Sequence, residues 1–328
     1  MNRARVFVST FPFAETNTIP LELLREAGCE IILNPLGRRL QDGELGGFLA
    51  DIDILIAGTE KIDRDVLDKA PRLSLIARVG IGLDGVDLLE CEKREIEVTY
   101  TPDAPAPAVA ELTIGLILNL IRFVGLSDRH IREGTWRRFF GMRISELTIG
   151  VIGAGRIGGR VIRRLAAFGS PRLLVNDLSP NTSICPSLKL EWVDKKTIFT
   201  ESDVVTLHVP LTKSTLGMVG QQEISLMKRG SFIINTCRGG VINETALLNA
   251  LNDHSIEGAA LDVFAQEPYE GPLRECERVL LTAHQGSMTR DCRERMELEA
   301  CQEAVHFTSG LAQISPVPEA EYRLRDAN

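Results

Sequence analysis

Short hydrophobic runs alternate with segments of helical periodicity through the first hundred residues of the chain. Runs rich in Val, Ile and Leu predict five strands, at 5–10, 29–34, 53–58, 74–79 and 97–101. Apolar residues at helical spacing predict helices between them, at 20–27, 40–50 and 64–69. This alternation predicts βαβ units, in which helices cover both faces of a parallel sheet.

A proline-rich segment and a long apolar helix separate this series from a second one. Residues 101–107 hold three prolines and form the predicted linker, because proline propagates neither a helix nor a sheet ladder. Residues 108–123 predict a helix that is apolar nearly all round, which indicates burial between domains or subunits. Six further strands are predicted, at 147–152, 173–177, 204–208, 232–236, 258–262 and 279–282. One last helix is expected after Gly286.

Composition and charge narrow the class of protein. The 328 residues predict about two domains, at roughly 150 residues each. The chain carries 37 Lys and Arg against 45 Asp and Glu without a basic block, which argues against nucleic-acid binding. The longest apolar stretch, 112–126, is shorter than the ~20 residues of a membrane span, and no signal peptide is apparent. Seven cysteines without a Cys-x-x-Cys pair predict reduced thiols in the cytoplasm, and no cluster has metal-ligand spacing.

A Gly-x-Gly-x-x-Gly motif lies at Gly153, Gly155 and Gly158, between a predicted strand and a predicted amphipathic helix. In that context the first glycine makes a tight turn, the second lets the backbone approach a pyrophosphate, and the third packs helix against strand. The helix N-terminus then offers amide donors to the phosphates. Asp177 ends the next strand about 20 residues later, where a carboxylate binds ribose hydroxyls and repels a 2′-phosphate. The sequence therefore predicts an NAD site.

The same glycine spacing recurs at Gly80, Gly82 and Gly85, also after a predicted strand. Asp103 even lies at about the matching distance, roughly 20 residues further on. However, the segment that follows, 87–94, is short and charged, and Asp103 falls in the proline-rich linker. We interpret this copy as a loop that faces another ligand or as a plain turn.

Polar residues at strand ends are the candidates for chemistry, because ligands of doubly wound sheets bind at the carboxyl ends of strands. His284 ends the last strand, and histidine suits the proton transfer that accompanies hydride transfer at a carbonyl. Glu267 is a candidate to orient that imidazole, and Arg238 offers a rigid fork to a carboxylate. His208 ends another buried strand and is a candidate for the cofactor cleft. Each of these residues could instead have a structural role, because their spacing in the sequence does not show which of them are close in space.

Four motifs in a fixed order resemble those of the D-isomer-specific 2-hydroxyacid dehydrogenases, the family of D-3-phosphoglycerate dehydrogenase. They are the loop 153–158 with Asp177, and the segments 235–240, 262–268 and 281–286. The similarity continues through 77–84, 109–113 and 202–212. Together with the helix pattern, this resemblance implies an α/β fold of two doubly wound parallel-sheet domains. A Rossmann NAD-binding domain, 102–285, would be inserted into a flavodoxin-like substrate domain, 1–101 plus 286–328, with the active site in the cleft between them.

The resemblance also implies roles for individual residues. Arg238 would hold the substrate carboxylate, His284 would be the acid/base and Glu267 its partner. The backbone of Val79, Gly80 and Ile81 would face the substrate carboxylate. The expected cofactor-binding residues are Gly153, Gly155, Arg156, Ile157, Gly158, Asp177, His208, Val209, Pro210, Thr236, Cys237, Asp262 and Thr113. The family is typically homodimeric, with helix 108–123 and an arm at 136–147 in the interface.

The substrate and two alternative functions stay open at this point. The expected substrate is a small 2-hydroxy or 2-oxo acid, with 3-phosphoglycerate as one candidate. Relatives that reduce phosphohydroxypyruvate often carry an Arg after the third strand, whereas this chain leaves Lys61, Arg78 or a partner subunit to meet a phosphate. The alternatives are a dinucleotide-sensing interaction protein of corepressor type and a phosphite- or formate-type oxidoreductase. Formate dehydrogenases of this family carry Gln where Glu267 stands, which disfavours that reaction.

Overall fold

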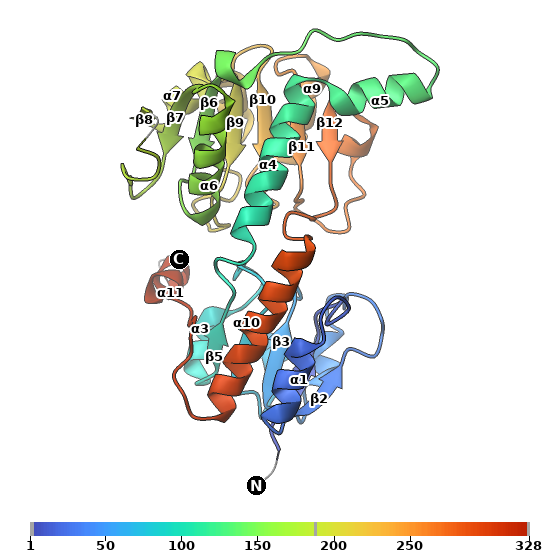
Figure 1. The fold of residues 1–328 in the computed structure, drawn as a ribbon, viewed down its shortest axis with the longest axis vertical. Coiled ribbons are helices and arrows are strands. Elements are labelled where there is room, and N and C mark those ends of the chain that lie inside the picture. Colours follow the sequence, from blue (N-terminus) through green and yellow to red (C-terminus); the bar gives the residue numbers. More distant parts are fainter. Residues whose placement is uncertain (1–2, 187–188, 327–328) are drawn as a thin grey trace. The chain divides into compact units, whose positions relative to one another are not determined.

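The computed structural model describes residues 3–186 and 189–326. The chain divides into two compact units (Figure 1), which we call unit 1 and unit 2. Unit 1 comprises Met1–Pro105 with Met288–Asn328, and unit 2 comprises Ala106–Ser287. Both units contain a sheet whose strands pair only in parallel, with helices on its faces. The predicted α/β fold class is therefore confirmed.

Unit 1 is built on a five-stranded sheet. Its strands are β1 (Arg5–Val8), β2 (Glu30–Leu33), β3 (Ile54–Ala57), β4 (Leu75–Arg78) and β5 (Glu97–Thr99). They lie in the order β2-β1-β3-β4-β5, which is the flavodoxin-type order of doubly wound sheets. The central strands β3 and β4 are buried at every position, which explains their nearly unbroken apolar runs.

In the described part of the chain, five helices surround the sheet of unit 1, and two of them begin at a side-chain cap. They are α1 (Ile19–Glu26), α2 (Arg64–Leu67), α3 (Leu88–Lys93), α10 (Arg290–Thr308) and α11 (Glu319–Asp326). The Asp63 and Asp87 side chains cap α2 and α3 by accepting hydrogen bonds from backbone N–H groups of the first turn. The buried core includes Phe7, Leu55, Ile76 and Leu88, so helices and sheet share one apolar interior.

Unit 2 is built on a seven-stranded sheet. Its strands are β6 (Thr148–Ile152), β7 (Arg172–Asn176), β8 (Leu190–Trp192), β9 (Val204–Leu207), β10 (Phe232–Asn235), β11 (Gly258–Leu261) and β12 (Val279–Leu281). They lie in the order β12-β11-β10-β9-β6-β7-β8. The order reverses at the neighbours β6 and β9, and such a switch point is where doubly wound sheets bind ligands.

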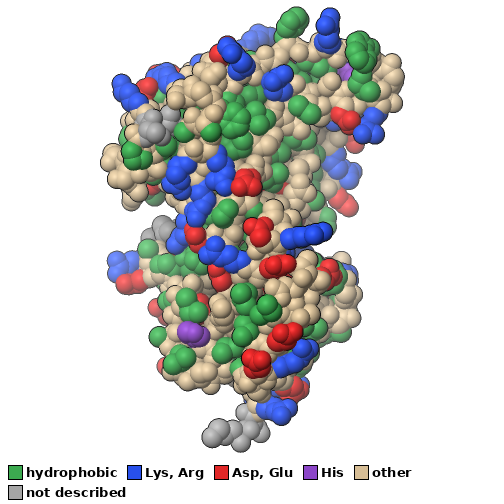
Figure 2. Space-filling view, viewed as in Figure 1, with side chains coloured by type: hydrophobic (Ala, Val, Ile, Leu, Met, Phe, Trp, Pro, Cys, Tyr) green, Lys and Arg blue, Asp and Glu red, His purple; other side chains and the backbone are tan. Residues whose placement is uncertain are grey.

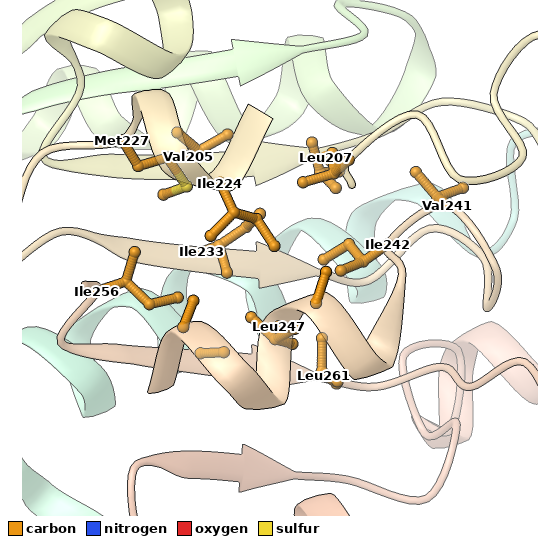
Figure 3. Close-up of a cluster of buried hydrophobic side chains, with 14 of the residues drawn as sticks. Val205, Leu207, Ile224, Met227, Ile233, Val241, Ile242, Leu247, Ile256 and Leu261 are labelled. Carbon is orange, nitrogen blue, oxygen red and sulfur yellow. The ribbon is translucent and has the colours of Figure 1, made fainter. Parts of the chain in front are cut away.

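Helices cover both faces of the sheet in unit 2, except α5 (Val124–Arg132), which has no buried residue and packs against α4 (Ala106–Ile121). The other helices are α6 (Arg156–Leu165), α7 (Lys195–Glu201), α8 (Gln221–Leu226) and α9 (Glu244–Asn252). On one face, Ile224 of α8 and Leu247 of α9 pack against Val205 and Ile233 of the strands (Figure 3). On the other face α4 packs beside α6 and belongs to a second buried cluster.

On the face shown in Figure 2, Lys and Arg side chains gather over α6 of unit 2, whereas acidic and basic side chains are mixed elsewhere. Among the described residues, no helix by itself has the length and apolar composition needed to cross a membrane. Helices α4 and α5 meet these criteria only as a pair, and the pair is bent by 61°.

Two sequence predictions of local structure were wrong, and the start of the helix after the linker was predicted two residues too late. Residues 40–50 form turns and one short 3-10 helix, Leu45–Phe48, because Gly46 and Gly47 interrupt the helical pattern. Helix α4 begins at Ala106, inside the predicted linker, because proline is tolerated in a first helical turn such as that of Pro107. After Gly286 the chain forms two helices, α10 and α11, rather than one. Further 3-10 helices cover Ile144–Glu146, Ala166–Phe168 and Pro272–Glu275.

Candidate active site

The glycine loop of unit 2 connects β6 to α6 and requires glycine for steric reasons. Gly153 has a φ of +89°, and a Cβ there would lie 2.3 Å from the carbonyl oxygen of His208. A Cβ on Gly158 would lie 1.9 Å from the carbonyl oxygen of Gly153. Gly155 is the N-cap of α6, and no atom lies within 4 Å of the position of its missing Cβ. The loop is therefore closely packed on its inner side and open at the helix N-terminus, next to Arg156 and Ile157.

Asp177 lies directly beyond β7, next to the glycine loop. Its Oδ2 accepts a hydrogen bond from the Ala154 N–H at 2.7 Å, and its Oδ1 accepts one from the Ser179 N–H at 2.8 Å. The carboxylate is thus fixed beside the loop, where an acid can bind the ribose hydroxyls of a dinucleotide.

His208 follows β9 and borders the same loop. Its Nε2 lies 3.0 Å from the Thr206 hydroxyl, whereas its Nδ1 is buried and has no hydrogen-bond partner within the described residues. Burial lowers the pKa of His208 from 6.5 to about 3, so the ring is neutral near pH 7. Val209 and Pro210 continue the chain from this point, half-buried and exposed, respectively.

The remaining predicted cofactor residues, Thr113, Thr236, Cys237 and Asp262, are all buried. The hydroxyls of Thr113 and Thr236 lie 2.9 Å apart, although 123 positions separate the residues in sequence. The Cys237 thiol donates to the Asn235 side-chain oxygen at 2.9 Å, and burial raises its pKa, so it stays protonated. The open helix N-terminus, the Asp177 carboxylate and the orphaned His208 nitrogen together fit a dinucleotide.

The candidate acid/base pair follows β11 and β12, at the same carboxyl edge of the parallel sheet as the glycine loop after β6. His284 Nδ1 lies 2.8 Å from Oε2 and 3.1 Å from Oε1 of Glu267. The two side chains are 37% and 19% exposed, respectively, so the pair is accessible to a ligand. Because Nδ1 faces the carboxylate, Nε2 is the ring nitrogen available to exchange a proton with a substrate.

Arg238 follows β10, the strand that pairs with β11. The Asn235 amide fixes its main chain by donating to the Arg238 carbonyl oxygen at 2.8 Å, and Arg238 Nη1 donates to the Cys237 carbonyl oxygen at 2.6 Å. Strands β10, β11 and β12 are parallel neighbours, so the segments that carry Arg238, Glu267 and His284 all start from one edge of the sheet. A guanidinium, a carboxylate and an imidazole at one edge suit binding and protonation of a carbonyl acid.

Asp262 was predicted to contact the cofactor, and the structure shows that its side chain holds the segment of His284. Its Oδ1 accepts hydrogen bonds from the Thr282 hydroxyl at 2.6 Å and the Gln285 N–H at 2.9 Å. Its Oδ2 accepts one from the Gly286 N–H at 2.9 Å. Sequence reasoning missed Thr282, whose signal is a hydroxyl at the end of an apolar strand, two positions before the histidine.

The predicted substrate loop, Val79, Gly80 and Ile81, follows β4 in unit 1. Gly80 has a φ of +149°, and its N–H donates to the Thr101 hydroxyl at 2.8 Å. The next helix, α3, has only six residues and starts beyond the glycine motif. This loop therefore differs in structure from the glycine loop of unit 2.

The fold and the polar residues at the sheet edge define a dehydrogenase that uses a dinucleotide. The family model described as "D-isomer specific 2-hydroxyacid dehydrogenase, NAD binding domain" matches residues 114–286. The chain belongs to the D-isomer specific 2-hydroxyacid dehydrogenase family, as the resemblance implied. It is an NAD-dependent oxidoreductase of the class that acts on CH–OH groups.

Similar proteins include curated relatives and solved structures. A glyoxylate reductase of Thermococcus litoralis is 36% identical over 271 residues, which cover 79% of this chain and 82% of that protein. A D-3-phosphoglycerate dehydrogenase of Methanocaldococcus jannaschii is 39% identical over 257 residues, 76% of this chain but only 49% of that protein. The structure of a D-lactate dehydrogenase from Aquifex aeolicus, complexed with NAD and lactic acid, aligns with a TM-score of 0.84. It is 28% identical and covers 95% of this chain and 98% of that chain.

Proposed function

We propose that the protein interconverts a small D-2-hydroxy acid and the corresponding 2-oxo acid, with His284 as the acid/base, Glu267 as its partner and Arg238 as the substrate-carboxylate ligand. The observation that carries this proposal is the His284–Glu267 pair at 2.8 Å, on the same sheet edge as the segment of Arg238. NADH, when bound, supplies the hydride that reduces the carbonyl carbon. Side chains and backbone groups of the protein meet the other requirements of the reaction.

In the direction of reduction, Arg238 binds the substrate carboxylate and draws electron density from the adjacent carbonyl. Protonated His284 donates the Nε2 proton to the carbonyl oxygen while the carbon receives the hydride, so that 2-oxo acid, NADH and one proton give 2-hydroxy acid and NAD⁺. The Glu267 carboxylate orients the ring through Nδ1 and stabilises the imidazolium before the transfer. In the direction of oxidation, neutral His284 accepts the hydroxyl proton.

The cofactor contacts follow from the glycine loop of unit 2. The pyrophosphate would lie at the N-terminus of α6, next to Gly155, Arg156 and Ile157. Asp177 would bind the ribose hydroxyls and select NAD over NADP, because its charge repels a 2′-phosphate. Thr113, Thr236, His208 and their neighbours would line the rest of the site.

Unit 1 would act as the substrate domain. Its loop of Val79, Gly80 and Ile81 leaves the carboxyl end of β4, where doubly wound sheets bind ligands. Its backbone N–H groups suit a second set of donors to the substrate carboxylate. For the substrate we favour a short acid such as glyoxylate or hydroxypyruvate. Glyoxylate reduction is the activity named for several relatives, and the chain spans about half the length of the phosphoglycerate dehydrogenase that it matches.

A panel assay tests this function directly. NADH consumption is followed with glyoxylate, hydroxypyruvate, phosphohydroxypyruvate and pyruvate, and the product is resolved on a chiral column. We expect turnover of at least one unphosphorylated acid and a D product wherever the product is chiral. Absence of turnover with every member would contradict the proposal.

We also propose a homodimer whose interface includes α4 and the arm that follows α5. The arm exposes Trp136 and Phe140, which are 84% and 101% exposed. A cavity of about 540 Å³ lies beside it, lined by Phe123, His130 and Arg278 among others. Large exposed aromatic side chains next to a half-apolar cavity are typical of a surface that a partner covers. Light scattering should give twice the chain mass, and a monomer at micromolar concentration would contradict it.

A cytoplasmic location is proposed from the thiols. All seven cysteines are free, and six of them are buried. Free thiols in this number persist in a reducing compartment. Fractionation of the native cells tests the location, and recovery of the protein with an oxidising compartment would contradict it.

A further inference from the structure

The loop that carries Glu267 needs support from outside, because it has no helix or strand of its own between β11 and the 3-10 helix Pro272–Glu275. A catalytic carboxylate must be held to within about 0.5 Å of its working position. One internal contact helps, since the Phe264 N–H donates to Glu267 Oε1 at 3.2 Å. The Phe264 and Tyr269 rings also stack, with centroids 4.3 Å apart. Both contacts join residues of the same loop, so neither fixes the loop to the rest of unit 2.

The loop of Arg238 provides the first external contact. A Cβ on Gly239 would lie 1.8 Å from the Phe264 carbonyl oxygen and 2.6 Å from the Ala265 nitrogen. The backbone that carries the proposed substrate ligand therefore packs directly on the peptide between Phe264 and Ala265. Only glycine allows this approach.

Glu244 provides the second external contact, at the same peptide. It is the first residue of α9, and its Oε1 accepts a hydrogen bond from the Ala265 N–H at 2.8 Å. Helix α9 is a firm anchor, because Leu247 is buried against the sheet (Figure 3) and Asn243 caps its first turn. The carboxylate also lies near the Tyr269 phenol, whose pKa is raised by burial and, to a smaller extent, by the Glu244 charge.

Two consecutive N–H groups of one turn thus bind two different carboxylates. The Phe264 N–H binds Glu267, and the Ala265 N–H binds Glu244. Because the two N–H groups belong to adjacent peptides, a rotation of the turn that frees the second also misaligns the first. Misalignment of the Phe264 N–H moves the carboxylate that faces His284 Nδ1.

We propose that Glu244 is a positioning residue for the reaction: by holding the Ala265 N–H, it fixes the turn that aligns Glu267 with His284. This inference rests on the proposed function, since it assigns Glu244 a part in the proton transfer made by that pair. Glu244 itself touches neither substrate nor cofactor in this account.

The alternative is a purely structural role, in which the Glu244 charge stabilises the N-terminus of α9. Two variants separate the roles because they remove different properties. Glu244→Asp keeps the charge in the first turn but is one methylene too short to reach the Ala265 N–H. Glu244→Gln loses the charge but keeps an acceptor oxygen at the same reach.

The positioning role predicts that Glu244→Asp lowers kcat for reduction roughly 10-fold, the factor of one hydrogen bond to a charged group. It also predicts that the alkaline limb of the pH profile of kcat/KM moves to lower pH, because a displaced Glu267 stabilises the imidazolium less. KM for the 2-oxo acid and the Kd of NADH stay within about threefold of the wild-type values, since the substitution changes no group that binds either ligand. Glu244→Gln retains the wild-type profile. Glu270→Gln, which removes a charge from an exposed position of the same loop, is the matched control and leaves kcat unchanged.

The opposite pattern overturns the proposal: Glu244→Asp with wild-type kcat and pH profile, or Glu244→Gln impaired as much as Glu244→Asp. The melting temperature of each variant is measured with the kinetics. If one of these variants does not fold, Glu244→Ala replaces it in the comparison. The positioning role predicts that Glu244→Ala lowers kcat and moves the alkaline limb as Glu244→Asp does. An alkaline limb at its wild-type position would refute that role. Failure of the proposed function is recognised separately, because the wild-type enzyme would then reduce no 2-oxo acid with NADH.

Discussion

Two loops of this chain carry glycines at the same spacing, one in each unit. In unit 2 the helix begins inside the motif, at Arg156, and runs for ten residues. In unit 1 the helix begins at Leu88, beyond the last glycine of the motif, and runs for six. Only the first arrangement directs several N–H groups of a helix N-terminus into the turn, which is what a pyrophosphate requires.

The two loops also differ in packing, because the third glycine is packed much more closely in unit 2 than in unit 1. A Cβ on Gly158 would meet the Gly153 carbonyl oxygen at 1.9 Å, whereas one on Gly85 would lie 3.2 Å from the Glu60 carbonyl oxygen. In the unit 1 loop, Thr101 binds the polar backbone groups of Gly80, through its hydroxyl and its N–H. A shared sequence spacing therefore defines a dinucleotide loop only when the third glycine lies in the first turn of a helix that packs on the strand.

The largest expected effect comes from filling the space at the third glycine. Gly158→Ala should raise the Kd of NADH roughly 100-fold, because the new methyl group forces α6 away from the turn and removes its N–H groups from the pyrophosphate. Gly85→Ala is the matched change in unit 1 and should leave that Kd within about twofold. Titration of NADH fluorescence measures both. Equal effects of the two substitutions would mean that the comparison of the loops is wrong.

The acids that follow the two motifs should differ almost as strongly. Asp177→Ala should lower the ratio of kcat/KM for NADH over NADPH roughly 30-fold, by loss of the ribose contact and of the repulsion of a 2′-phosphate. Asp103→Ala, at the corresponding distance from the unit 1 loop, should leave the ratio unchanged. Initial rates with each cofactor test this pair, and an unchanged ratio in Asp177→Ala would show that another residue selects the cofactor.

The unit 1 loop is expected to affect the substrate rather than the cofactor. Gly80→Ala places a side chain at a φ of +149°, a conformation that costs other residues about 1–3 kcal/mol. We expect KM for the 2-oxo acid to rise roughly 10-fold, with the Kd of NADH unchanged. If instead the Kd of NADH rises and KM does not, this loop binds the cofactor.

The smallest expected effect concerns His208, whose carbonyl oxygen closes the unit 2 loop. Burial lowers its pKa in the folded state from 6.5 to about 3, so below pH 6.5 the unfolded chain binds a proton that the folded protein does not. The free energy of unfolding therefore falls as the pH is lowered through this range. His208→Gln should abolish about 1 kcal/mol of the loss between pH 6.5 and 5.5. Urea denaturation of the wild type and the variant at the two pH values measures this difference. An identical loss of unfolding free energy in the two proteins would contradict a His208 ring that stays neutral in the folded state.

Much of the fold follows from the sequence, because the central strands of both parallel sheets are buried on two faces and appear as short unbroken apolar runs. The errors have specific causes. Residues 40–50 have helical spacing, but Gly46 and Gly47 disfavour the helix. Strand β8 was not predicted, since it has three residues, all partly exposed, at the edge of its sheet.

The sequence predicts the individual residues of the candidate site but not which of them lie close together. His284 and Arg238 have a local signal, a polar side chain at the end of an apolar strand. The approach of Glu267 to His284 depends on an irregular loop, and the contact of Thr113 with Thr236 joins residues 123 positions apart. The sheet order that joins such segments depends on the whole core, so spacing alone does not reveal which of these side chains meet.

The central claim, that His284 exchanges the proton in an NAD-dependent reaction of a 2-oxo acid, is tested most directly by single-turnover NADH oxidation in wild type and His284→Ala. We expect the variant to bind NADH with wild-type affinity but to reduce the preferred acid about 10²–10⁴-fold more slowly, the range expected for loss of a general acid. A variant that reduces the acid at the wild-type rate would contradict the role of His284 as the acid/base.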